Sequence, residues 1–267
     1  MCGLYTCLIA LAAVFPAVLA ECNRTHLFEW AHNFVDAQAL GFAGYLDGAS
    51  DDFVYQENNK TMDLTAGVMR KMLKIDHNRT IADSVTCSSY TEIISADAAQ
   101  PYVIGAQIHH NPSDMKAYLV DSIVSTTGSW LFNATQTLHY ALQENWGVLP
   151  ENKRDTRTTL KNAADAYLNI WSNKSAIDAV PWGTPCARLE GGAYTGKGEP
   201  NDSCKVGIPT NNNQAPNSHR RYVIDETVGS ASVLCIFEHL QMAPDSHEFR
   251  LEGGKLRYVH TITVPQK

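Results

Sequence analysis

Apolar side chains recur at the spacing of an amphipathic helix in three stretches of the chain. Residues 28–40, 62–75 and 157–171 each repeat apolar positions three to four residues apart. Positions with that spacing share one face of a helix, so the pattern predicts three helices, each with one buried face. Thr25 precedes the first stretch and is expected to cap its N-terminus.

Shorter apolar runs predict strands between and after these helices. One set lies in the first half of the chain, at residues 53–55, 80–94, 102–109 and 116–124, with 130–135 closing it. A second set lies in the last third, at residues 181–190, 221–225, 231–239, 249–251 and 256–264. Gly253 and Gly254 supply the positive φ angles that a tight hairpin between the last two strands requires.

The two sets repeat one order of elements. The run that starts with Arg221 and Asp225 echoes the run that starts with Arg79 and Asp83, and residues 181–190 stand where residues 53–58 stand in the first set. A helix followed by a curved antiparallel sheet is the order of cone-shaped folds such as nuclear transport factor 2. We therefore predict an α+β protein of two tandem cone-shaped units, with helices packed on each sheet. The predicted bounds are 21–137, a connector at 138–154, and 155–267.

The first residues predict a signal peptide over residues 1–20. The run from residue 8 to residue 20 is almost entirely apolar and ends in small residues at positions that a signal peptidase reads. A membrane anchor is the competing interpretation, but the run is short for a span and no basic cluster follows it. We expect a protein that is secreted or lies in the secretory-pathway lumen, without membrane association.

Six N-x-Ser/Thr sequons follow this leader. Asparagines that accept glycans lie on the surface, so the sequons predict exposed positions. The six asparagines are Asn23, Asn59, Asn78, Asn133, Asn173 and Asn201.

Five cysteines remain after the leader, and an odd number leaves at least one thiol free. Cys235 lies inside an apolar strand and is expected to be the buried free thiol. Cys186 and Cys204 flank a glycine-rich loop and are expected to close it, which leaves Cys22 to pair with Cys87. No Cys-x-x-Cys pair or histidine at ligand spacing accompanies them, so we expect no metal site.

The formal net charge of −7 disfavours a nucleic-acid partner. No basic run with interleaved aromatic residues is present. Motifs for acyl transfer, phosphate binding, dinucleotide binding and zinc-dependent hydrolysis are absent, so we expect no cofactor. The sequence leaves open whether the chain forms a homodimer.

Three segments, at residues 181–192, 221–225 and 245–260, carry a resemblance to a known family. In them the chain is similar to fungal secreted proteins of largely uncharacterised function. Some members of similar size resemble hetero-Diels–Alderases of tropolone–sesquiterpenoid pathways, which join a tropolone quinone methide to a humulene-type alkene. The resemblance implies a cofactor-independent pericyclase with an apolar small-molecule substrate.

A cycloaddition without cofactors requires reactants held face to face, a hydrogen-bond donor for the heterodiene carbonyl, and aromatic walls. Tyr258 and His260 alternate along one strand face with Leu256 and Ile262, which is expected to line the interior. They are the candidate catalytic donors, and buried polar groups of the core are the alternative. Trp182 is expected to form a wall of the same cavity, with an ordinary core position equally open.

Further substrate-binding candidates are His247, Arg250 and Tyr55. His247 and Arg250 precede the last hairpin, and Tyr55 holds the corresponding place in the first unit. The structural alternative for Arg250 is an ion pair with Asp225. Two other functions remain open: a secreted small-molecule-binding protein without turnover, and a secreted effector with a protein partner.

Overall fold

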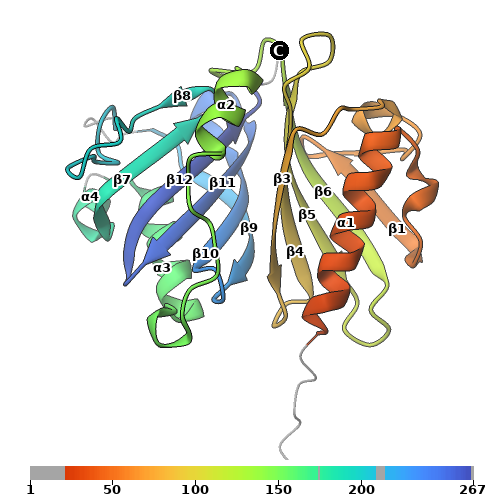
Figure 1. The fold of residues 1–267 in the computed structure, drawn as a ribbon, viewed down its shortest axis with the longest axis horizontal. Helices are drawn as coiled ribbons and strands as arrows, with labels where there is room; N and C mark the ends of the chain where they lie inside the picture. The colour runs from red at the N-terminus through yellow and green to blue at the C-terminus, as the bar shows by residue number, and fades with distance from the viewer. Residues whose placement is uncertain (1–21, 174, 209–213, 266–267) are drawn as a thin grey trace, which may run out of the picture.

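The computed structural model describes residues 22–173, 175–208 and 214–265, and its strands form two six-stranded sheets (Figure 1). The first sheet has the order β2-β1-β6-β5-β4-β3. Its strands are β1 (Ala49–Glu57), β2 (Lys60–Met62), β3 (His77–Asp83), β4 (Ser88–Ser95), β5 (Tyr102–His110) and β6 (Ala117–Thr126). The leader predicted at residues 1–20 lies outside the described residues.

The second sheet repeats that order as β8-β7-β12-β11-β10-β9. Its strands are β7 (Trp182–Glu190), β8 (Ala193–Tyr194), β9 (Asn217–Asp225), β10 (Ser230–Phe237), β11 (Ala243–Glu252) and β12 (Lys255–Thr263). The tandem two-unit α+β arrangement is therefore present.

The sheets are mixed, and the expectation of purely antiparallel sheets is wrong. β1 pairs with β6 in parallel, and β7 pairs with β12 in parallel. In each unit the three successive hairpins from the third strand to the last bring that last strand beside the first, running in the same direction. The parallel pair inside each sheet is thus joined through the rest of the unit, whereas the edge strands β2 and β8 pair antiparallel with β1 and β7.

Each sheet carries one long helix on its outer face. α1 (Arg24–Leu40) buries Leu27 and Phe34 against the first sheet, and its cap is Asn23, whose side chain accepts from two backbone N–H groups, not Thr25. α3 (Arg157–Asn169) covers the second sheet and is capped by Thr156. The shorter helices are α2 (Ala134–Ala141) and α4 (Ala176–Ala179).

The helix predicted over residues 62–75 does not form. The stretch contains the end of β2 and a short 3-10 turn at Gly67–Arg70. Gly67 has φ +61°, and a Cβ there would lie 2.1 Å from the Glu57 carboxylate, which accepts from the Val68 N–H. Tertiary contact with Glu57 therefore overrides the helical spacing of the apolar residues.

Three strand predictions also need correction. Residues 80–94 form two strands, β3 and β4, since the chain turns between them. Residues 130–135 lead into α2 instead of closing the sheet, and β11 begins at Ala243, well before residue 249. The Gly253–Gly254 hairpin forms as predicted, with positive φ at both glycines.

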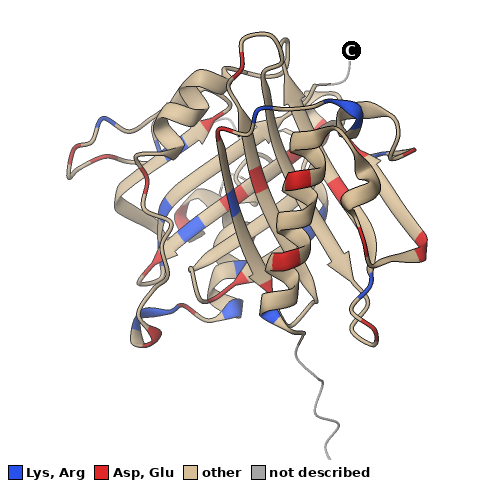
Figure 2. Ribbon diagram, turned by 45° about the vertical axis from the view of Figure 1, so that its right-hand side comes forward, with Lys and Arg blue, Asp and Glu red and all other residues tan. Residues whose placement is uncertain are grey.

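The two sheets pack on each other through the faces opposite α1 and α3. Apolar side chains of both sheets share one buried cluster there, including Ile81, Tyr90, Leu234 and Ile262. Charged residues also lie in the middle of strands, not only in loops (Figure 2). The interface between the units therefore combines an apolar core with buried charge.

Two aspartate bridges join the units in a matching way. The Asp225 carboxylate accepts from Arg24 at 2.6 Å and from the Ala82 N–H at 3.0 Å. The Asp83 carboxylate accepts from Arg157 at 2.7 Å and from the Ile224 N–H at 3.0 Å. Arg24 and Arg157 are the first residues of α1 and α3, so the two bridges are equivalent in the repeated units.

The predicted disulfide pairs and the predicted free thiol are confirmed. Disulfides join Cys22 to Cys87 and Cys186 to Cys204, and Cys235 is a free, buried thiol. Disulfides of this kind persist in oxidising compartments, which fits an extracellular protein. Among the described residues, no helix is both long enough and apolar enough to cross a bilayer.

Candidate functional site

A cavity of about 280 Å³ lies on the face of the second sheet that α3 covers, and Trp130, from the segment between β6 and α2, contributes to its lining. Its apolar walls come from Trp130, Trp171, Phe237 and Leu240. Its polar lining includes Arg188, Glu190, His247, Thr261 and Thr263. A concave, partly aromatic pocket with a few convergent polar groups is the usual form of a small-molecule site.

The alternation of side chains along β11 and β12 determines which polar residues face the cavity. His247 on β11 stands opposite Thr261 on β12, and Asp245 stands opposite Thr263. Successive residues of a strand face opposite sides, so these odd-numbered positions turn toward α3 while Ser246 and Glu248 turn toward the other unit. The contact between the His247 and Tyr167 rings, whose centroids are 5.7 Å apart, confirms this orientation, because Tyr167 belongs to α3.

His247 is held by its neighbours and has one ring nitrogen free for a ligand. Its ring stacks on Phe249, with centroids 5.8 Å apart, and its Nδ1 lies 3.0 Å from the Asp245 carboxylate. Thr263 donates to the other oxygen of Asp245 at 2.7 Å. Because Nδ1 faces Asp245, Nε2 is the nitrogen that can contact a molecule in the cavity.

Arg188 forms the second polar group of the cavity. Its guanidinium lies 2.7 Å from Glu190 and donates to the Tyr167 hydroxyl at 3.2 Å. Burial disfavours the charge on Arg188, yet Tyr167 and Glu190 raise its pKa above the ordinary value. The cavity therefore contains a fixed cation with its counterion, next to a histidine.

Tyr258 and His260 do not line this cavity. Both lie on the face of β12 that is turned away from α3. The register between β7 and β12 shifts between Leu256 and Tyr258. Because of this shift, Leu256 packs on the α3 side although it has the same parity as Tyr258 and His260. The prediction that Trp182, Tyr258 and His260 face one cavity is therefore wrong. A strand irregularity at this point reverses the face that strict alternation assigns.

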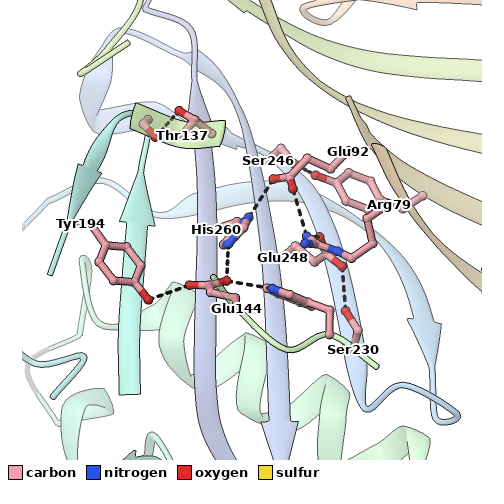
Figure 3. A network of polar contacts seen from close by, with 12 residues as sticks. Arg79, Glu92, Thr137, Glu144, Tyr194, Ser230, Ser246, Glu248 and His260 are labelled. Atoms are coloured by element: carbon pink, nitrogen blue, oxygen red, sulfur yellow. Dashed lines mark hydrogen bonds and ion pairs between the residues drawn. The ribbon is translucent and has the colours of Figure 1, made fainter. Parts of the chain in front are cut away.

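His260 lies in a buried charge network between the units (Figure 3). Its Nδ1 is 2.8 Å from Glu92 and its Nε2 is 2.7 Å from Glu144. Burial disfavours the imidazolium, but the two carboxylates raise the pKa of His260 to about 10. Although burial opposes it, His260 and Arg79 hold the pKa of Glu92 well below its ordinary range.

Arg79 and Trp146 complete this charge network. Arg79 lies 3.2 Å from Glu92 and 2.5 Å from Glu248, and its guanidinium stacks 3.7 Å from the Trp146 ring centroid. Trp146 donates to Glu144 at 2.7 Å. The predicted connector thus contributes Glu144 and Trp146 to the contact between the units, which sequence reasoning missed. Charged residues inside otherwise apolar strands, as at Arg79, are the signal that could have indicated the network.

The other predicted binding residues have structural contacts instead. Trp182 packs on the α3 core and donates to the Ile177 carbonyl at 2.9 Å. Arg250 is buried and donates to the carbonyls of Gly147 and Val228, not to Asp225. Tyr55 lies in the core of the first unit and donates to Glu57 at 2.7 Å. Among the six candidates, His247 alone lines the cavity.

Five of the six sequon asparagines are exposed, as the sequons predict. Asn59 differs, because its Nδ2 is buried without a hydrogen-bond partner while its Oδ1 accepts from Arg221 at 3.1 Å. The nitrogen that would carry a glycan is therefore inaccessible at this one position.

Comparison with known proteins finds similarity only to proteins of unknown function. Residues 153–263 match a family model described as a domain of unknown function, DUF8021, which covers less than half of the chain. No curated protein matches the chain. Among solved structures, an NTF2-like protein of unknown function from Shewanella baltica OS155 is similar over 39% of this chain and 94% of its own, with 8% identity and a TM-score of 0.29.

Proposed function

We propose that the cavity beside α3 is the active site of a cofactor-independent enzyme that acts on a small, ring-containing, oxygenated molecule. One observation carries the proposal: the buried residue His247 lines a cavity together with the aromatic side chains of Trp171 and Phe237. In this proposal, Trp171 and Phe237 stack on the ring of the ligand, and His247 hydrogen-bonds its carbonyl oxygen.

The volume of the cavity limits the size of the ligand. Ligand pockets usually measure about 300–1,000 Å³. At about 280 Å³ the cavity accepts one compact ring system, and a larger partner would extend past Trp130, which is 45% exposed at the rim. A planar, tropolone-sized molecule fits this description better than a sesquiterpene.

This arrangement supports a hetero-Diels–Alder reaction as the specific form of the proposal. The quinone methide would occupy the cavity with its carbonyl toward His247, and the alkene would approach from the rim. A hydrogen bond to that carbonyl withdraws electron density from the heterodiene and strengthens as the transition state forms. Holding the two reactants together recovers the entropy of their encounter. The catalytic role first assigned to Tyr258 and His260 passes to His247.

Binding and turnover are tested separately with tropolone as the probe. Titration should quench tryptophan fluorescence through Trp171 and Trp130 in the wild type, and Trp171→Leu should reduce that change. His247→Gln should weaken binding, whereas Tyr258→Phe, outside the cavity, should leave it unchanged. Absence of quenching, or equal quenching in Trp171→Leu, would contradict the assignment of the cavity.

Turnover is then measured with a tropolone quinone methide and a humulene-type alkene. Losing one preorganised transition-state donor typically costs about 10²–10³ in rate, so His247→Gln should slow product formation by that factor. Melting curves recorded beside each rate separate loss of the donor from loss of the fold. Tropolone binding without any acceleration over the uncatalysed reaction would indicate the alternative, a secreted small-molecule-binding protein without turnover.

A further inference from the structure

Three potential metal ligands meet in the wall behind the cavity. Cys235 on β10 stands directly opposite Asp245 on β11, and His247 follows two residues later on the same face. The Cys235 sulfur lies 3.6 Å from Asp245 Oδ2, and His247 Nδ1 lies 3.0 Å from the same oxygen. All three residues are buried, with 0%, 0% and 3% of their surfaces exposed in the order Cys235, Asp245, His247.

The His247 ring leaves a polar atom unsatisfied in this cluster. Nδ1 is buried and has no hydrogen-bond partner, although the Asp245 carboxylate lies only 3.0 Å away. The ring nitrogen and the carboxylate are therefore close without being aligned as donor and acceptor. Buried polar atoms in folded proteins nearly always have a hydrogen-bond partner or a metal ion. A partner for His247 Nδ1 would therefore lie in a different direction from the Asp245 carboxylate.

A tetrahedral metal ion accounts for these separations. Metal–sulfur bonds of about 2.3 Å and metal–nitrogen or metal–oxygen bonds of about 2.0 Å place tetrahedral sulfur and oxygen ligands about 3.5 Å apart, and nitrogen and oxygen ligands about 3.3 Å apart. The observed distances are 3.6 Å and 3.0 Å. We propose that Cys235, Asp245 and His247 bind a divalent cation of the zinc class through Sγ, Oδ2 and Nδ1.

The charges and hydrogen bonds of the cluster suit such an ion. Binding displaces the Cys235 thiol proton to solvent, so one proton is released for each ion and the thiolate and carboxylate together neutralise its two charges. Thr263 holds the second oxygen of Asp245 at 2.7 Å, which is the type of outer contact that orients a metal-binding carboxylate. Spacing along the sequence did not indicate this site because its ligands come together through strand pairing.

The site goes beyond the proposed ligand cavity and does not depend on it. His247 would bind the ion through Nδ1 and keep Nε2 toward the cavity. Because the ion lies behind the histidine, it fixes the ring without occupying the space of the ligand. Tropolone binding and metal binding can therefore be measured, and can fail, independently.

The test uses purified full-length protein without a histidine tag, titrated with Zn²⁺ by calorimetry and with Co²⁺ by absorption. Wild type should bind one ion per chain and release one proton, and the Co²⁺ form should show a thiolate-to-metal charge-transfer band. Cys235→Ser should abolish that band and weaken Zn²⁺ binding by more than the roughly 10–100-fold that loss of an outer-shell contact costs. Asp245→Asn should weaken binding as well.

His239→Asn provides the matched control, because His239 lines the same cavity but lies outside the cluster. It should bind Zn²⁺ as the wild type does. Melting curves without metal verify that each variant is folded, and added Zn²⁺ should raise the melting temperature of wild type and of His239→Asn only. No binding by the wild type, or binding that survives Cys235→Ser unchanged, would overturn the proposal and leave only the hydrogen bond from Cys235 to Asp245 beside His247.

Discussion

Replacing His260 by glutamine should show how strongly the charge network holds the two units together. Glutamine can keep one hydrogen bond to Glu92 or Glu144, but it removes the positive charge that both carboxylates share. Arg79 then remains as the nearby cation for Glu92. Glu144 is left buried with only neutral donors from Trp146 and Tyr194.

The size of the effect follows from the shifted pKa. A rise in the pKa of His260 from 6.5 to about 10 corresponds to about 5 kcal/mol of preference for the charged form in the folded state. Removing one partner of a buried ion pair typically costs about 3–5 kcal/mol. The lowered pKa of Glu92 reflects the same ion pair with His260, so its free energy is not counted a second time. We therefore expect His260→Gln to lower the free energy of unfolding by about 3–5 kcal/mol near pH 6.

The sign of the pH dependence distinguishes this explanation from simple loss of packing. Because the folded-state pKa of His260 is raised, its contribution is complete below 6.5 and is lost as the pH rises toward 10. The stability gap between wild type and His260→Gln should therefore shrink between these pH values.

Urea unfolding of both proteins at several pH values, read by fluorescence and circular dichroism, measures the gap. His32→Gln is the control, since its side chain is 72% exposed and should give no gap. A gap below about 1 kcal/mol near pH 6, or one that stays constant up to pH 10, would refute the reasoning.

Three further outcomes are expected. Asp83→Asn and Asp225→Asn should each lower the free energy of unfolding by about 1.5–3 kcal/mol, the usual value of a hydrogen bond to a charged group. Urea unfolding measures both variants, and a loss of stability in only one of them would contradict the equivalence of the two bridges. Gly105→Ala should lower the melting temperature, because the added Cβ would lie 2.7 Å from the Tyr90 hydroxyl and 2.9 Å from the Ser246 hydroxyl. Partial recovery in the double variant with Tyr90→Phe would confirm the first clash, and an unchanged melting temperature in Gly105→Ala would disprove both. Peptide mapping of the secreted protein should find Asn59 unmodified while the exposed sequons carry glycans, and a glycan at Asn59 would show that its buried Nδ2 is accessible before folding is complete.

Local sequence signals predicted the parts of the fold that depend on neighbouring residues. The helix predicted at 157–171, which the structure shows at Arg157–Asn169, the Gly253–Gly254 hairpin and both disulfide pairs were expected from spacing, turn residues and cysteine placement. The predicted helix over 62–75 failed because the conformation of Gly67 depends on Glu57, a residue from another element. Periodicity carries no information about such a contact.

The candidate site was harder to predict because it depends on which face of each strand is enclosed. Alternation correctly grouped Tyr258 with His260, but it could not show that this face meets a second sheet. His247 was chosen for its place before the hairpin, whereas its cavity contacts come from α3 and β12. Pairing of Cys235 with Asp245 is likewise a property of strand register, which the sequence alone does not reveal.

The charge network also affects whether the C-terminal unit could fold without the N-terminal unit. The family match begins at residue 153, yet Glu92, Glu144 and Trp146, which surround His260, all precede that point. A gene that encodes the matched region alone would yield a sheet whose His260 and Glu248 lack their counterions. Any relative built from that unit by itself would have to replace those two charges with neutral residues, or cover them with a second copy of the unit. If the two units arose by gene duplication, each now depends on charged residues of the other. Separating the units would then leave the buried charges of both without their counterions, so the duplication could not easily be reversed.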